Sequence, residues 1–173
     1  MVKNLHLVMP NQLAWGEQRF ACTIGRGGVA AVDKKREGDL KTPSGSFAAR
    51  CCYYRPDRMA PPLTALPLIA LQPDDGWCDD PAHPLYNQPV KLPFAGRHEK
   101  LWREDHVYDL IIPLGYNDGV DGPIIKGAGS AIFMHVMRED GVGTEGCVAL
   151  KREDLLEVLA HIDTSTCVVV SQS

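Results

Sequence analysis

Long apolar runs are missing from this 173-residue sequence, and so is any cluster of basic residues. The longest apolar stretch, 65–71, contains Pro67 and is far shorter than the ~20 residues that a membrane-spanning helix needs. Lysine and arginine number 18 against 22 acidic residues, and they are spread along the chain. A net charge of −4 without a basic patch gives no electrostatic surface for nucleic acid or anionic lipid. We therefore expect no nucleic-acid partner and no membrane partner.

The first ten residues also lack the features of a secretory signal peptide. Such a signal needs an uninterrupted apolar stretch of about 7–15 residues, whereas Asn4 and His6 break the segment and Pro10 stops it. The segment is more typical of a first strand. We expect a cytoplasmic protein, or a periplasmic one if a leader precedes this sequence in the natural chain.

The six cysteines form no recognisable metal or dithiol motif. No two have the Cys-x-x-Cys spacing of zinc and redox sites, and the chain is larger than disulfide-stapled secreted domains. We therefore predict reduced thiols, no metal site and no cofactor. Cys22 and Cys167 lie in apolar, strand-like segments, so we expect them to be small buried side chains.

Short segments of alternating apolar residues indicate a mainly β fold. In 4–9 and 20–24, apolar side chains recur at every second position, as in a strand with one buried face. Sixteen glycines and thirteen prolines make up about 17% of the residues, above the usual ~12%, and indicate many turns. Further strands are predicted at 29–32, 47–54, 66–71, 107–112, 131–136 and 166–170.

One helix is expected, at 151–162, because Leu155, Leu156, Leu159 and Ile162 recur at helical spacing. No repeat or linker divides the chain, so residues 1–173 are expected to form a single domain. The segment 73–106 is long, rich in aspartate and proline, and carries two tryptophans. A connection of this length is more often a functional insertion or lid than a spacer.

The segment 132–150 holds the clearest chemical signal. His135 ends a predicted strand, and Cys147 follows it by twelve residues, directly after Gly146 and before the predicted helix. The glycines of 141–146 allow the chain to fold back and bring imidazole and thiol together. An imidazolium and a helix N-terminus both favour the reactive thiolate, and backbone amides near Cys147 can stabilise an oxyanion.

Two motifs resemble the L,D-transpeptidase catalytic (YkuD) family. Thr144-Glu145-Gly146-Cys147-Val148, preceded by a strand that carries a histidine, is similar to the family's Ser/Thr-His-Gly-Cys block. Upstream, Asp39-Leu40-Lys41-Thr42-Pro43-Ser44-Gly45-Ser46-Phe47 resembles its acidic-x-x-Thr-Pro-x-Gly-x-Phe segment. From the residues themselves we expect a Pro-set turn, a positive φ at Gly45 and Phe47 entering the core.

The resemblance implies a mainly β, sandwich- or barrel-like fold of mixed sheets, with one short helix after the catalytic cysteine. It implies an enzyme that cleaves peptidoglycan stem peptides between a diamino acid and a terminal D-alanine. Cys147 would be the nucleophile, His135 the base, the Val136 carbonyl its orienting partner, and Gly146 part of the oxyanion hole. Carbapenem-type inhibitors are then expected to acylate the thiol.

The sequence departs from the family pattern at three points. Glu145 replaces the usual histidine, Ala149 replaces a polar residue, and the His-to-Cys spacing is short. Thr144 and Glu145 are expected to bind substrate. Glu145 either takes over contact with a cationic amine of the substrate, or raises the pKa of the thiol and weakens the nucleophile.

These departures leave four functions open. The first is an L,D-carboxypeptidase that trims soluble muropeptides from tetrapeptide to tripeptide, with water as acceptor. The others are a cross-linking L,D-transpeptidase, a non-catalytic module that binds stem peptides, and a thiol redox sensor in which Cys51 or Cys52 resolves an oxidised Cys147.

Overall fold

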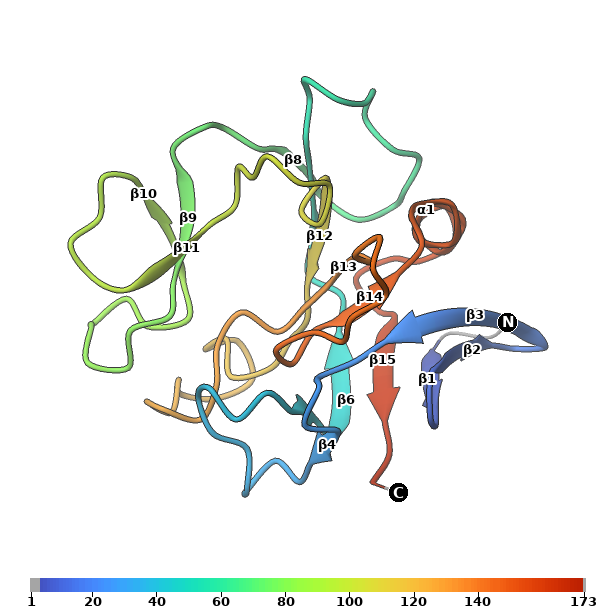
Figure 1. Cartoon of the computed structure of the whole chain (residues 1–173), viewed down its shortest axis with the longest axis horizontal. Coiled ribbons are helices and arrows are strands. Elements are labelled where there is room, and N and C mark those ends of the chain that lie inside the picture. Colours follow the sequence, from blue (N-terminus) through green and yellow to red (C-terminus); the bar gives the residue numbers. More distant parts are fainter. Residues whose placement is uncertain (1–3, 173) are drawn as a thin grey trace.

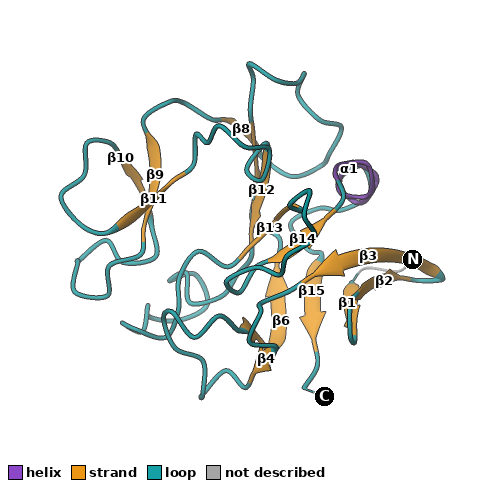
Figure 2. Ribbon diagram, viewed as in Figure 1, coloured by secondary structure: helices purple, strands orange, loops and turns teal. Residues whose placement is uncertain are grey.

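The computed structural model describes residues 4–172, which form fifteen β-strands and one α-helix (Figures 1 and 2). Short strands separated by long loops account for most of the chain, as the abundance of turn residues predicts. The elements are β1 (Leu5–Val8), β2 (Gln12–Trp15), β3 (Gln18–Thr23), β4 (Val29–Ala30), β5 (Thr42–Pro43), β6 (Gly45–Ala48), β7 (Cys52–Tyr54), β8 (Leu68–Ala70), β9 (Asp75–Cys78), β10 (Pro89–Lys91), β11 (His98–Lys100), β12 (Leu110–Pro113), β13 (Phe133–Val136), β14 (Val148–Leu150), α1 (Arg152–Leu159) and β15 (Cys167–Val170).

Ten strands form one mixed sheet in the order β6-β15-β1-β2-β3-β14-β13-β12-β7-β8. The pairs β1/β15, β13/β14 and β7/β8 are parallel, and the remaining pairs are antiparallel. β6 and β7 follow each other in sequence but stand far apart in this order. Between them Ala49 bridges to Leu114, just after β12, so the sheet curls back on itself. The mainly β, curled architecture of mixed sheets is confirmed.

The predicted strands are found, with one division. The segment 47–54 is two strands, β6 and β7, because the chain passes from one part of the curled sheet to another at 49–51. The alternation in 20–24 is confirmed, since Phe20, Cys22 and Ile24 are all buried. In 4–9 it fails at the end, because β1 stops at Val8 and Met9 lies exposed in a turn.

The helix α1 is shorter than the predicted 151–162 but lies where it was expected. Leu155 and Leu159 are buried with Val158, while Leu156 is half-buried; Ile162 is buried beyond the end of the helix. With eight residues, α1 is too short to cross a bilayer, and no other helix occurs in residues 4–172.

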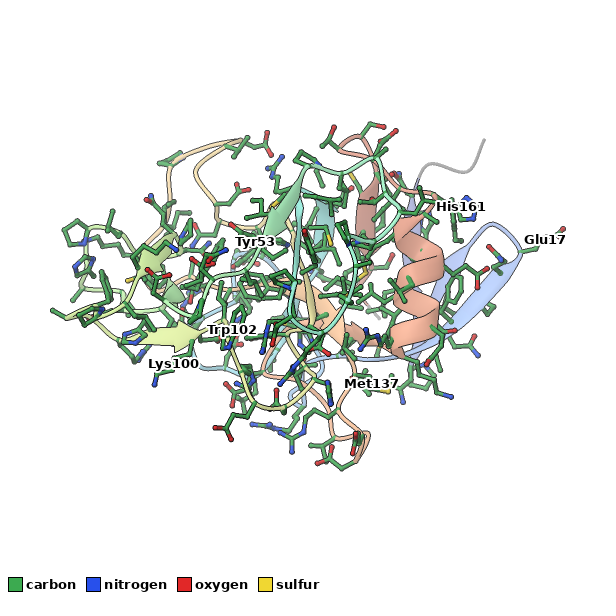
Figure 3. The ribbon with its side chains drawn as sticks, turned by 90° about the horizontal axis from the view of Figure 1, so that it is seen from above. Glu17, Tyr53, Lys100, Trp102, Met137 and His161 are labelled. Atoms are coloured by element: carbon green, nitrogen blue, oxygen red, sulfur yellow. The ribbon has the colours of Figure 1, made fainter. Side chains whose placement is uncertain are left out.

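The long segment 73–106 is not a structureless lid. β9 is paired on both sides, by β10 and by β11, in a separate three-stranded sheet. This small sheet projects at one end of the molecule, with α1 at the other (Figures 1 and 3). We refer to residues 73–106 as the insertion.

Two apolar clusters fill the interior. The larger lies between the curled sheet and α1 and includes Cys22 and Cys52. The smaller joins the insertion to β12 and β13, and it contains the cysteine of the candidate site; its buried members are Leu71, Trp77, Leu101, Tyr108, Ile111, Ala131, Phe133 and Cys147. The prediction that Cys22 is buried is therefore confirmed, whereas Cys167 is only half-buried.

Candidate active site

Cys147 and His135 line one cavity of about 370 Å³. Its wall is built from both the large sheet and the insertion, together with the loops before β12 and β14. The lining side chains are mostly polar or charged, and include Arg26, Glu37, Asp79, Glu99, Arg103, Tyr108, Ser130, Arg138, Thr144 and Glu145.

The parallel pair β13/β14 brings the histidine and the cysteine together. In its register Met134 lies opposite Val148 and His135 opposite Ala149, so Cys147 sits at the start of β14 beside the strand that carries the histidine. The loop between the strands turns back through Gly141, which has a φ of 66°. The fold-back expected from the glycine-rich segment 141–146 is thus present.

The thiol of Cys147 is held by the backbone of the neighbouring segment. Its Sγ accepts a hydrogen bond from the Phe133 amide at 3.3 Å and donates one to the Ala131 carbonyl at 3.1 Å. Burial raises the pKa of this thiol to about 12, with a further contribution from the negative charge of Glu99. Burial therefore favours the neutral thiol in the resting site.

His135 is held in the tautomer that a base requires. Its Nδ1 lies 2.8 Å from the Val136 carbonyl oxygen, so Nδ1 carries the proton and Nε2 keeps its lone pair. Tyr108 packs edge-on against the ring at 5.4 Å. Burial lowers the imidazole pKa to about 4, so the ring is neutral at pH 7. Within residues 4–172 no hydrogen bond joins it to the Cys147 sulfur.

The helix does not assist the thiol. β14 separates Cys147 from the first turn of α1, and five residues at ~3.3 Å each put the helix N-terminus well over 10 Å away. The helix dipole acts only within about the first turn, so it does not stabilise a thiolate here. The helix N-terminus that was expected next to Cys147 is displaced, because residues 148–150 form a strand between them.

Thr144 shapes the turn before Cys147. Its hydroxyl donates to the Cys147 carbonyl at 2.6 Å and accepts from the Gly146 amide at 3.1 Å. The Gly146 amide is thus occupied, and an oxyanion-hole role for it does not fit this geometry. The amide of Cys147 donates to no acceptor within residues 4–172, so it is the donor available to an oxyanion.

Gly146 is required by close packing. Its φ is 146°, and a Cβ built on it would lie 2.9 Å from the Lys41 carbonyl oxygen. Lys41 precedes the Thr-Pro segment, so the two motifs meet at this glycine.

Further bonds tie these motifs together. Thr144 exchanges backbone hydrogen bonds with Ile24 and Arg26, and the Gly25 amide donates to the Thr42 hydroxyl. The segment 25–28 turns sharply, but it is not a hairpin, because β3 and β4 do not pair.

The Thr-Pro-x-Gly-x-Phe segment is structural. Thr42 and Pro43 form β5 instead of the expected Pro-set turn, because they pair with β4. Gly45 has a φ of 145° and Phe47 is buried against Tyr116, both as predicted.

Glu145 lies at the exposed rim of the cavity. Its carboxylate is 3.3 Å from Arg26, with three-quarters of the side chain accessible. Its charge raises the pKa of Cys147, as one of the two alternatives expected, but less than burial and Glu99 do. Ala149 is buried in β14 and does not line the cavity.

Sequence reasoning missed the contribution of the insertion. Glu99, from β11, accepts a hydrogen bond from the Tyr108 hydroxyl at 2.6 Å, and burial raises its pKa. Arg103 reaches the same wall. The composition of 73–106 indicated a functional insertion. No sequence motif, however, connects the charges of Glu99 and Arg103 with Cys147, which lies more than forty residues later.

The insertion also anchors the segment that holds the thiol. The Asn87 side-chain oxygen accepts from both Trp77 Nε1 and the Ala131 amide, each at 2.9 Å. Trp77 packs edge-on against Phe133 at 5.0 Å. Trp102 stacks under Arg55 instead of lining the cavity. Both tryptophans therefore anchor the insertion.

Within residues 4–172 no group of three or more His, Cys, Asp or Glu side chains is arranged to hold a metal ion. The aspartates of the insertion form ion pairs instead: Asp74 and Asp75 with Lys91, and Asp79 with Arg97.

The family model of the L,D-transpeptidase catalytic domain (YkuD) matches residues 5–170. This span contains every element of the site. Searches of curated proteins and of solved structures give no match.

Proposed function

Because this chain belongs to the L,D-transpeptidase catalytic domain family, whose members are cysteine-dependent enzymes acting on peptidoglycan, we propose that it is an L,D-carboxypeptidase. It removes the terminal D-alanine from stem tetrapeptides of soluble muropeptides and leaves tripeptides. A cytoplasmic location stays a prediction.

In the proposed reaction, Cys147 Sγ attacks the carbonyl carbon before the terminal D-alanine while its proton passes to His135 Nε2. The Cys147 amide stabilises the oxyanion, and His135 returns the proton to the nitrogen of the leaving D-alanine. A water, deprotonated by His135, then attacks the thioester, and the tripeptide carboxylate and the Cys147 thiol are released.

The size of the cavity carries the choice of water over an amine acceptor. At about 370 Å³ it lies near the lower end of the ~300–1,000 Å³ typical of small-molecule sites. Such a volume suits one peptide end, whereas a cross-linking enzyme must hold a second stem peptide at the thioester and exclude water. The exposed Glu145 and the buried Ala149 stand where family members carry polar residues, which also weakens acceptor binding.

A thiol redox sensor is disfavoured by the same site. Sensor cysteines are exposed and have a low pKa, whereas Cys147 is 8% exposed with a raised pKa. Within residues 4–172 all six cysteines are free, and Cys52 belongs to the other apolar cluster.

The test is a product ratio. Monomeric tetrapeptide is incubated with the protein, with and without an added D-amino acid or second stem peptide, and products are followed by mass. We expect tripeptide and free D-alanine to dominate, and Cys147→Ala to abolish them. Exchanged or cross-linked peptide in excess would identify a transpeptidase, and no turnover a binding module.

A further inference from the structure

Three arginines line the cavity, and each has an acidic partner. Arg26 pairs with Glu145, Arg138 with Asp140, and Arg103 with Asp105. A cavity that binds peptides with several carboxylates needs cations. The position of each guanidinium group relative to His135 decides which carboxylate of the peptide it can reach.

Arg103 lies on the His135 side of the cavity. Its guanidinium is 5.2 Å from the ring centre of Tyr108, and that ring packs against His135. Its positive charge also contributes to the low pKa of the imidazole. Arg26, in contrast, stands at the rim with Glu145.

Arg103 is oriented before any ligand binds. Nε and Nη2 donate to Asp105 at 2.8 Å and 2.5 Å, while Nη1 makes no hydrogen bond within residues 4–172. The guanidinium group is therefore held by Asp105 through Nε and Nη2, while Nη1 is available to a ligand. Such preorganisation lowers the entropic cost of binding a carboxylate.

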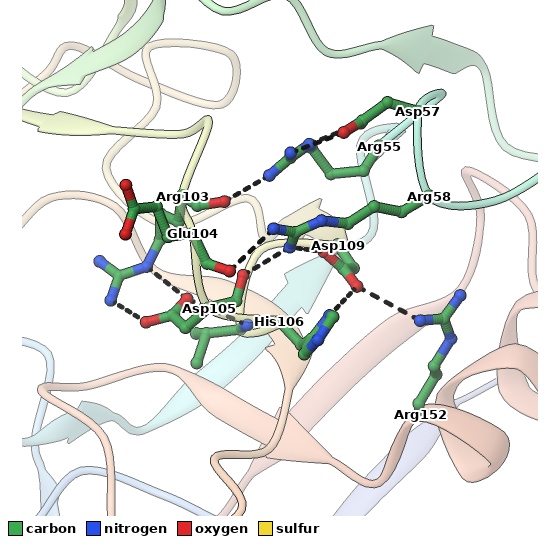
Figure 4. Close-up of polar contacts among 10 residues, drawn as sticks. Arg55, Asp57, Arg58, Arg103, Glu104, Asp105, His106, Asp109 and Arg152 are labelled. Atoms are coloured by element: carbon green, nitrogen blue, oxygen red, sulfur yellow. Dashed lines mark hydrogen bonds and ion pairs between the residues drawn. The ribbon is translucent and has the colours of Figure 1, made fainter.

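A network of arginines and carboxylates holds the loop that carries Arg103 (Figure 4). The Arg103 carbonyl accepts from buried Arg55, which is stacked at 3.8 Å on Trp102. Arg58 donates to the Glu104 and Asp105 carbonyls, and also to the Asp109 carboxylate. This loop delivers Arg103, Val107 and Tyr108 to the cavity.

The Asp109 carboxylate at the centre of the network is completely buried. It also receives hydrogen bonds from His106 and Arg152, at 2.8 Å and 3.2 Å, which ties the loop to α1. The position of Arg103 is thus set by the fold and not by a free surface loop.

The chemistry of the leaving group places a carboxylate beside His135. His135 must protonate the nitrogen of the departing residue, and the terminal carboxylate sits on the next carbon, within one residue length of ~3.8 Å. A cation that recognises this carboxylate must therefore lie on the His135 side of the cavity, and Arg103, across the Tyr108 ring from His135, is on that side.

We propose that Arg103 Nη1 binds the terminal carboxylate of the stem peptide and so makes the enzyme selective for a free C-terminus. The inference rests on the proposed function, because it takes D-alanine as the leaving group. Arg103 is then a specificity-determining residue, contributed by the loop that follows the insertion's last strand.

The experiment compares a tetrapeptide that ends in D-alanine with the same peptide ending in D-alaninamide. Calorimetry measures the binding of each peptide to Cys147→Ala, which cannot turn over, alone and combined with Arg103→Gln, Arg103→Lys or Arg19→Gln. A charge-assisted hydrogen bond predicts a 10- to 100-fold preference of Cys147→Ala for the free carboxylate. Arg103→Gln should bind both peptides equally, Arg103→Lys should keep part of the preference, and Arg19→Gln, at an exposed arginine outside the cavity, should keep all of it.

An unchanged preference in Arg103→Gln, or a preference lost in Arg19→Gln, overturns the proposal. So does the absence of any preference in Cys147→Ala. If Arg103→Gln does not fold, Arg103→Lys decides by a reduced or an unchanged preference. Hydrolysis of the tetrapeptide by the unmodified protein is measured separately. If it fails while Arg103-dependent selectivity is present, the proposed function is wrong and the carboxylate site stands.

Discussion

At the scale of single residues, the site is a neutral pair of buried side chains. Burial acts on both partners in the direction of the uncharged form: it raises the pKa of Cys147 to about 12 and lowers that of His135 to about 4. The resting enzyme therefore has no thiolate–imidazolium pair. In the proposed reaction, proton transfer from sulfur to Nε2 therefore accompanies attack on the substrate.

The pH dependence of kcat/KM follows from this neutral pair. The imidazole must be unprotonated to accept the thiol proton, so activity should fall only as pH drops through about 4, well below the ordinary pKa of 6.5. It should stay level up to at least pH 9, because the thiol remains protonated until far higher pH. The measurement is tetrapeptide hydrolysis from pH 4 to 10, with circular dichroism to verify the fold. An acid limb near 6.5 combined with a fall near pH 8 would instead indicate an ion-pair mechanism.

A carbapenem should acylate Cys147 once. The thiol adds to the β-lactam carbonyl and opens the ring, so intact mass should rise by one whole inhibitor molecule. Cys147→Ala is the control, and it should remain unmodified because no other cysteine of residues 4–172 lines the cavity that contains His135. An adduct on Cys147→Ala, or none on the unmodified protein, contradicts the assigned nucleophile.

At the scale of elements, the insertion holds Cys147, the proposed nucleophile, in place. Asn87 joins Trp77 of β9 to Ala131, and Ala131 in turn accepts the thiol hydrogen bond. Asn87 has a φ of 59°, a backbone conformation that glycine adopts without strain. Replacement by glycine therefore removes the side chain without straining the backbone.

We expect Asn87→Gly to lower both stability and kcat/KM. Two buried N–H groups lose their acceptor, at about 1–3 kcal/mol each, and a thiol displaced by ~1 Å can lose about 100-fold in rate. Urea unfolding and tetrapeptide hydrolysis measure the two effects. The neighbouring Gln88→Ala, in the same turn, is the matched control. Full activity in Asn87→Gly would show that the insertion does not position Cys147.

The elements of the large sheet were largely predictable from the sequence, because one-sided burial leaves an alternating pattern. The strand at 148–150 was not, since all three residues are buried and a short apolar run before a helix has no period. The same limit applies to the site. Cys147 and His135 carry a local motif, whereas Glu99 and Arg103 reach the cavity only through the tertiary placement of the insertion.

At the scale of the whole molecule, β15 joins the two halves of the large sheet. It lies between β6 and β1, antiparallel to the former and parallel to the latter. Val168 is fully buried in this position, and Val169, on the opposite face, is half-buried.

Val168→Thr should therefore destabilise the whole domain, because it buries a hydroxyl in an apolar core at a cost of about 1–3 kcal/mol. Val169→Thr keeps the same shape change at a half-buried position and should shift the free energy of unfolding by less than ~0.5 kcal/mol. Chemical denaturation followed by tryptophan fluorescence compares the two. Equal shifts would mean that β15 does not have a buried face at Val168.

The position of β15 also sets the order in which the molecule can assemble during synthesis. Leu5 of β1 pairs with Val168 of β15, so β1 gains its parallel neighbour only from a residue far along the sequence, and the contact closes a very long loop. Until 167–170 leave the ribosome, β1 and β6 each present an open edge to the surrounding cell. Before 167–170 are in place, these two edges can pair with strands of other chains, so the sheet is prone to aggregation until β15 covers them.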